Sequence, residues 1–180
     1  MRASVDGIMV GMRTLLRDDP KLTIRSAEGR KPNRIIVDSN AQTPVTSYVV
    51  RTAKEIPTIV AVTSRAPKNR IKILDQRGVI VLVCGRGPLV SVKILLRTLR
   101  RLGIRKILLE GGGALNWSML NNRLVDEVSV AITPRILGGQ KAVSLVEGRG
   151  SPLVRDGINL KLLNTMKYGP DLVVRYKVIG

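Results

Sequence analysis

The order of strand-like and helix-like segments constrains this fold more than any other feature of the sequence. Short apolar runs bounded by turn residues recur along the N-terminal part of the chain, and apolar patterns of helical spacing separate them. The runs cover residues 8–10, 34–37, 58–63, 79–84 and 106–109, and the helical patterns cover 12–17, 66–77, 89–102 and 113–121. Such alternation predicts a parallel sheet with helices on both faces.

The C-terminal part of the sequence has a different order. Residues 127–133, 160–167 and 171–179 have the pattern of strands, and no helical pattern separates them, so we expect them to pair antiparallel. A chain of 180 residues with 44% hydrophobic residues has the size and the apolar content of one domain. We therefore predict a single α/β domain over residues 1–180, with a mostly parallel central sheet, antiparallel C-terminal strands and helices on both faces.

The stretch from Ile107 to Ser118 joins a predicted strand to a predicted helix through three glycines. The strand ends at Glu110, Gly111 to Gly113 follow, and the helical pattern begins at once. Glycines allow a sharp turn and a close approach of a ligand to the backbone, and a helix N-terminus offers unpaired N–H donors. The stretch matches neither the dinucleotide fingerprint Gly-x-Gly-x-x-Gly nor a P-loop. It predicts an anion cradle, and a tight turn without a ligand remains the alternative.

Two other turns carry polar side chains after predicted strands. In the first, a glycine turn leads into a short helix that contains Thr14 and ends at Asp18, Asp19 and Pro20; in the second, Ser39 follows the strand at 34–37. Thr14 could donate to a phosphate oxygen, and the aspartates could accept from sugar or amide groups. Each turn also has a plain structural interpretation, since Asp, Pro and Ser are common turn residues.

The composition excludes several kinds of site. The chain has no histidine, which removes Ser-His-Asp triads, Cys-His pairs and the usual zinc sites. No cluster of Asp and Glu argues for a magnesium site, so we expect no metal, and Cys84 has the sequence context of a buried hydrophobe. Proton transfer would then depend on Asp, Glu, Lys, Tyr or water, with a bound cofactor carrying the harder chemistry.

The charge predicts an anionic ligand. Lys and Arg number 31 against 13 Asp and Glu, a net charge of +18, but the basic residues are scattered and aromatic residues are scarce. Without an aromatic platform we do not expect sequence-specific nucleic-acid binding. No apolar run is long enough to cross a membrane and no signal peptide is visible, so we expect a cytoplasmic protein.

Residues 2–25, 34–40 and 107–139 taken together resemble the reductases of riboflavin biosynthesis that act on 2,5-diamino-6-ribosylamino-4(3H)-pyrimidinone 5′-phosphate. The runs LEGGGALNW (109–117), LVDE (124–127) and PRILGG (134–139) carry the resemblance. The archaeal stand-alone form is the nearest, and the reductase half of the bacterial bifunctional deaminase–reductase is more distant. The resemblance implies a dihydrofolate reductase-like fold, a homodimer, and reduction of the ribosyl group to a ribityl chain with NADPH as hydride donor; NADH stays an open alternative.

The resemblance also assigns roles to residues of this chain. The implied substrate contacts are Arg2, Leu22, Arg25 and Glu110, and the proton donor is left open among Asp18, Glu110 and water. Arg65 is one candidate for the 2′-phosphate of NADPH, with a solvated surface arginine as the alternative. The implied cofactor contacts are Thr14, Asp18, Ser39, Gly111, Gly112, Gly113, Ala114, Leu115, Asn116, Trp117 and Ser118.

Two other functions remain open at this point. One is a dihydrofolate reductase-like enzyme with another pyrimidine or pteridine substrate, and the other is a nucleotide- or RNA-binding module, which the net charge of +18 favours. The resemblance further implies a strand, a loop and a helix before Arg2. We therefore expect either a start assigned too late or a truncated product, whose neighbouring strands would lack a partner.

Overall fold

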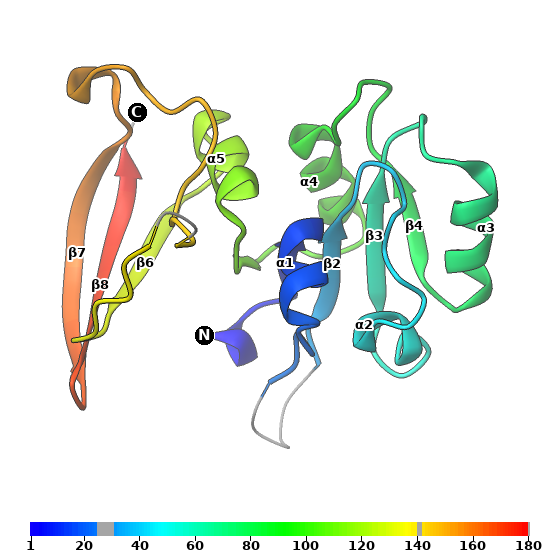
Figure 1. The fold of residues 1–180 in the computed structure, drawn as a ribbon, viewed down its shortest axis with the longest axis horizontal. Helices are drawn as coiled ribbons and strands as arrows, with labels where there is room; N and C mark the ends of the chain where they lie inside the picture. Colours follow the sequence, from blue (N-terminus) through cyan, green and yellow to red (C-terminus); the bar gives the residue numbers. More distant parts are fainter. Residues whose placement is uncertain (25–30, 140–141, 180) are drawn as a thin grey trace.

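The computed structural model describes residues 1–24, 31–139 and 142–179, and Figure 1 shows their arrangement. Within these residues the chain forms a five-stranded parallel sheet and a separate three-stranded antiparallel sheet. The parallel strands are β1 (Gly7–Gly11), β2 (Asn33–Val37), β3 (Thr58–Val62), β4 (Ile80–Val83) and β5 (Ile107–Leu109). The predicted mostly parallel α/β fold is confirmed.

The strand order of the parallel sheet is β4-β3-β2-β1-β5. From β1 to β4 the chain adds each strand on the same side, whereas β5 returns to the other side of β1. Met9 at the centre of β1 is paired with Ile35 of β2 and Leu109 of β5. The direction of winding therefore reverses between β1 and β5, and open α/β sheets bind ligands at the carboxyl ends of the strands at such a switch point.

Helices cover both faces of the parallel sheet. Alternate residues of β1 point to opposite faces, so Ile8 and Val10 join one buried cluster and Met9 joins the other. Helices α1 (Met12–Asp18), α2 (Tyr48–Arg51) and α3 (Lys68–Gln76) supply side chains to the first cluster, and α4 (Val92–Arg101) and α5 (Gly113–Asn121) supply the second. Each fully buried aliphatic side chain contributes about 1.5–3 kcal/mol, which fixes both helix layers against the sheet.

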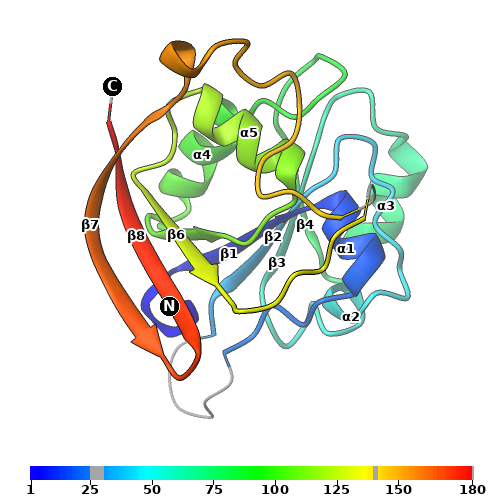
Figure 2. The same cartoon turned by 60° about the vertical axis from the view of Figure 1, so that its left-hand side comes forward.

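The three-stranded sheet contains β6 (Glu127–Ile132), β7 (Asn159–Tyr168) and β8 (Asp171–Ile179) in the order β6-β8-β7. It curves past α5 (Figures 1 and 2). Short 3₁₀ helices, η1 (Arg2–Ser4) and η2 (Val154–Asp156), precede β1 and β7. The antiparallel strands were predicted correctly, but they form their own sheet, since no described strand pairs with the outer edge of β5.

Two local predictions need correction. Helix α4 begins at Val92 rather than at residue 89, because the hydroxyl of Ser91 accepts a hydrogen bond from the Ile94 amide and caps the first turn. Leu89 therefore lies outside the helix and is 74% exposed. Helix α2 was not predicted, since its four residues are too few for a helical period to stand out.

Candidate functional site

Two turns that lie far apart in the sequence meet at the carboxyl ends of β1 and β5. The Gly11 amide donates to the Gly111 carbonyl at 3.0 Å, and the Glu110 amide donates to the Met9 carbonyl at 2.9 Å. Helix α1 begins directly after β1, and α5 begins after the three glycines. The glycine cradle and the Thr14 turn thus flank the switch point of the sheet, which is where the two motifs can act on one ligand.

Gly111 and Gly112 leave space and donors at this point. A Cβ on Gly112 would lie 3.0 Å from the Thr14 hydroxyl, and Gly111 has a φ of +106° with no atom within 4 Å of the place of its missing Cβ. The Gly111–Gly112 peptide bond is cis. The Leu115 and Asn116 amides both donate to the Gly112 carbonyl, so the earlier amides of the first turn are the ones free for a ligand. Together with the Thr14 hydroxyl they can hold an anion.

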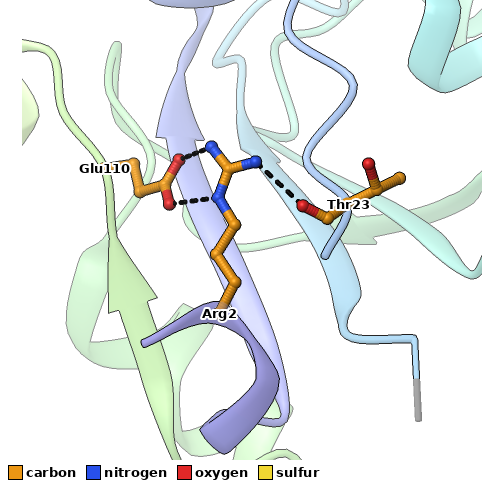
Figure 3. A network of polar contacts seen from close by, with 3 residues as sticks. All are labelled: Arg2, Thr23 and Glu110. Carbon is orange, nitrogen blue, oxygen red and sulfur yellow. Dashed lines mark hydrogen bonds and ion pairs between the residues drawn. The ribbon is translucent and has the colours of Figure 1, made fainter. Parts of the chain in front are cut away.

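The side chains of Arg2 and Glu110 form a paired contact close to the glycine cradle (Figure 3). Arg2 Nε donates to Glu110 Oε1 at 2.7 Å, and Arg2 Nη2 donates to Oε2 at 2.5 Å. Arg2 Nη1 also donates to the Thr23 carbonyl at 2.9 Å. The hydrogen bond to Glu110 raises the pKa of Arg2 above its ordinary value, because it stabilises the charged guanidinium. The contact fixes η1 against the end of β5.

The other predicted substrate residues lie on the segment after α1. Leu22 is buried and has a φ of +50°, and it directly precedes Thr23, the acceptor of Arg2. Arg25 lies outside the described residues. Arg2 and Glu110 are therefore brought together next to the glycine cradle, whereas the Leu22 side chain is buried in the core cluster that contains Leu15 of α1.

Asp18 lies at the last turn of α1 and is paired with its neighbour. Arg17 donates to both of its carboxylate oxygens, at 2.7 and 2.8 Å. This hydrogen bond lowers the pKa of Asp18 below its ordinary value. Asp18 is therefore ionised at neutral pH, which suits a hydrogen-bond acceptor and disfavours it as a proton donor.

Ser39 and Arg65 lie at the carboxyl ends of the next strands. The Ser39 hydroxyl accepts a hydrogen bond from the Val90 amide at 3.1 Å, and its carbonyl accepts from Thr63. The Arg65 amide donates to the Thr63 hydroxyl, while the residue is exposed. These residues lie on the same edge of the parallel sheet as the glycine cradle.

The remaining predicted cofactor residues on α5 lie in two environments, the core and the contact with the loop before η2. Leu115 is buried in the core, whereas Asn116 Nδ2 donates to the Leu145 carbonyl at 2.8 Å. Trp117 lies against Gly148, where a Cβ would be 2.7 Å from the indole. Two hollows of about 260 and 250 Å³ border Trp117 and Leu120 towards the three-stranded sheet, and neither includes the three glycines.

One residue at the cradle was missed by the sequence analysis. Glu147 packs against Gly113, and its carboxylate lies 3.8 Å from Arg13 Nη1 on α1. Glu147 belongs to a loop with no strand or helix period, so no signal in the sequence placed it there. Among the described residues no group of three His, Cys, Asp or Glu side chains could hold a metal, and no helix is long and apolar enough to cross a membrane.

The chain is similar to known proteins along its whole length. The profile of the RibD C-terminal domain family matches residues 1–174. The chain is 42% identical to a 2,5-diamino-6-ribosylamino-4(3H)-pyrimidinone 5′-phosphate reductase of Methanothermobacter thermautotrophicus, over all of this chain and 83% of the relative. It is 40% identical to the protein of the same name from Aquifex aeolicus, over all of this chain and 80% of that one.

Solved structures show the same fold. Acinetobacter baumannii RibD superposes with a TM-score of 0.82 at 25% identity, over 99% of this chain and 48% of that chain. This chain thus spans about half of that structure. The Saccharomyces riboflavin biosynthesis reductase Rib7 superposes with a TM-score of 0.77 at 25% identity, over 99% of this chain and 77% of that one.

Proposed function

This chain belongs to the RibD C-terminal domain family, and on that premise we propose that it is a reductase of riboflavin biosynthesis. It reduces the ribosyl group of 2,5-diamino-6-ribosylamino-4(3H)-pyrimidinone 5′-phosphate to a ribityl chain, with a nicotinamide cofactor as the hydride donor. The observation that carries the proposal is the glycine cradle at the switch point between β1 and β5, in a chain 42% identical to a reductase of that name over its whole length.

The residues of the cradle fit a dinucleotide. The missing Cβ of Gly112 leaves the Thr14 hydroxyl accessible, and α5 begins directly after Gly112, so the hydroxyl and the first amides of the helix would hold the pyrophosphate. When bound, the cofactor supplies the hydride, which explains how a chain without histidine can be a reductase. We propose NADPH rather than NADH, because the exposed Arg65 lies at the carboxyl end of β3, where Thr63 bonds both to the Ser39 carbonyl and to the Arg65 amide.

Arg2 and Glu110 are the proposed substrate contacts. The described hydrogen bonds of Arg2 use three of its five N–H groups, which leaves two donors for a phosphate or a carbonyl oxygen of the substrate. Glu110 is held at the end of β5, beside Gly111, so it lies between the cradle and Arg2. Asp18 is paired with Arg17 and Glu110 with Arg2, so the proton donor stays a choice among Asp18, Glu110 and water.

A homodimer is part of the proposal. The three-stranded sheet exposes large apolar side chains, among them Ile132 at 53%, Leu162 at 54% and Leu172 at 41%. Exposed apolar surface of this kind is typical of an interaction face, and the resemblance implies a second copy of the chain as the partner. Analytical ultracentrifugation at several protein concentrations measures the oligomeric state directly.

We expect the enzyme to work in the cytoplasm.

The proposed function is tested by turnover together with cofactor titration. The purified chain should oxidise NADPH only when the ribosylaminopyrimidine phosphate is present, and Gly112→Asp should remove NADPH binding because a carboxylate would face the pyrophosphate. Binding of NADPH without turnover of this substrate would favour a reductase of another pyrimidine or pteridine. Absence of NADPH binding, together with salt-sensitive binding of RNA, would favour the nucleic-acid module.

A further inference from the structure

The segment from Val143 to Gly150, which we name the strap, crosses the N-terminal end of α5. It contacts the helix at three points: the Leu145 carbonyl accepts from Asn116, Glu147 packs on Gly113, and Gly148 packs on Trp117. In Figure 2 the strap is the yellow-orange segment that passes between α5 and α1. The strap therefore covers the same end of α5 that is proposed to bind the cofactor.

The contact between Glu147 and Gly113 admits no side chain on the glycine. A Cβ on Gly113 would lie 2.5 Å from Glu147 Cγ, 2.8 Å from Cδ and 2.9 Å from the backbone nitrogen. The φ of Gly113 is not in the left-handed region, so the backbone conformation alone does not require glycine here. The third glycine of the cradle is thus needed to accommodate Glu147 of the strap.

The carboxylate of Glu147 lies among positive charges. Arg13 Nη1 is 3.8 Å from Glu147 Oε2, whereas Arg17, one turn further along α1, is paired with Asp18. The N-terminus of α5 adds the partial positive charge of the helix. The N-terminus of α5 belongs to the place proposed for the pyrophosphate, and Arg13 directly precedes Thr14 on α1.

We propose that the Glu147 carboxylate mimics the pyrophosphate of the cofactor while the site is unliganded. The carboxylate then has to leave the cradle when the dinucleotide binds. The proposal rests on the proposed function, since it needs the cradle to be the pyrophosphate site. Two anions at one helix N-terminus repel each other, and the space above Gly113 is filled by Glu147. If the strap is closed for most of the time, only the small open fraction can bind the cofactor. The apparent dissociation constant then rises as that open fraction falls.

The first test measures anion binding with inorganic pyrophosphate and with NADPH. Glu147→Gln keeps the size of the side chain and removes its charge, so both ligands should bind about threefold to tenfold more tightly than to the wild type. Glu55→Gln, an exposed change after α2, is the matched control and should leave both dissociation constants unchanged. Unchanged or weaker binding by the Glu147 variant would overturn the proposal.

The second test uses the only tryptophan of the chain, which lies against the strap. Displacement of the strap moves Gly148 away from Trp117, so saturation with pyrophosphate should shift the tryptophan emission of the wild type. Gly148→Ala should also tighten pyrophosphate binding, because its Cβ would lie 2.7 Å from the indole and open the strap. A shift that is absent on saturation, or weaker binding by this variant, would contradict the strap model.

The role of Glu147 and the reductase function are distinguished by different outcomes. If the wild type binds NADPH and reduces the substrate but Glu147→Gln binds NADPH no more tightly, Glu147 does not mimic the pyrophosphate. The reductase function then still holds. If pyrophosphate binds with the expected Trp117 shift but NADPH does not bind, the strap covers an anion site and the reductase is wrong.

Discussion

The hydroxyl of Thr14 lies 3.0 Å from the position that a Cβ on Gly112 would occupy, although the two residues belong to different turns at the switch point of the sheet. Thr14 comes from the first turn of α1, which follows β1, and Gly112 is the N-cap of α5, which follows β5. Because β1 and β5 are parallel neighbours, their carboxyl ends bring these turns together. The contact defines the floor of the proposed pyrophosphate site.

Gly112→Ala is expected to weaken NADPH binding about tenfold, which corresponds to ~1.4 kcal/mol. The φ of Gly112 is −60°, which alanine adopts freely, so the effect arises from the methyl group that meets Thr14 and the ligand. Isothermal titration with NADPH measures the loss. Thr14→Val should weaken binding as well, whereas Thr98→Val on the exposed side of α4 should not. Equal affinities for the Thr14 and Thr98 variants would remove Thr14 from the site.

Glu110→Gln is expected to raise the KM for the pyrimidine substrate at least several-fold and to leave the NADPH dissociation constant unchanged. The change removes the charge that orients Arg2, while the amide keeps the shape of the side chain. Glu127→Gln breaks a similar ion pair with Arg175 in the three-stranded sheet and is the matched control. Both pairs are partly exposed, so each loss should lower stability by only about 0–1 kcal/mol. A KM that does not change would show that Glu110 only fixes η1.

Arg65→Ala is expected to weaken NADPH binding about tenfold and to leave NADH binding unchanged, because only NADPH carries the 2′-phosphate. The ratio of the two dissociation constants measures the specificity. Arg77→Ala, at the end of α3, changes the net charge equally and should affect neither cofactor. A parallel loss for both cofactors would assign Arg65 a general electrostatic role.

Arg34→Met is expected to destabilise the fold by about 3 kcal/mol, since it leaves buried acceptors without donors. The Arg34 side chain is fully buried and donates to the Thr52 hydroxyl and to the carbonyls of Thr52 and Ile56, which joins β2 to the end of α2. Burial lowers the pKa of this arginine below its ordinary value. Urea denaturation measures the loss, and Arg51→Met, an exposed change on α2, should cost much less.

Cys84 is expected to make the free energy of unfolding decrease slightly as the pH rises above neutral. Burial raises the pKa of its thiol above the ordinary value, so the folded chain holds the proton at a pH where the unfolded chain releases it. The contribution is complete below the unfolded pKa and is lost as the pH rises towards the folded pKa. Denaturation midpoints between neutral pH and pH about 10 should fall less for Cys84→Ala than for the wild type. Identical slopes would show that other groups control the alkaline limb.

Much of the local structure could be predicted from the sequence. Helix α5 spans Gly113–Asn121 as predicted, and β8 spans Asp171–Ile179 as predicted, because periodicity and turn residues are local signals. The burial of Cys84 within an apolar run also follows from local pattern. The three glycines after Glu110 pointed to an anion cradle for the same reason, since their chemistry depends on neighbours in the chain.

The arrangement of these parts depended on contacts that no local pattern encodes. Three features depend on residues that are distant in the sequence: the position of β1 between β2 and β5, the paired contact of Arg2 with Glu110, and the separate antiparallel sheet. Glu147 lies in an irregular loop and packs against Gly113. Only the tertiary structure shows that the third glycine leaves room for this side chain. The sequence by itself determined the elements and the chemistry of the cradle, because these follow from backbone propensity and residue type. The tertiary structure decided which groups share the site, because strand order and loop packing depend on the free energy of the whole chain.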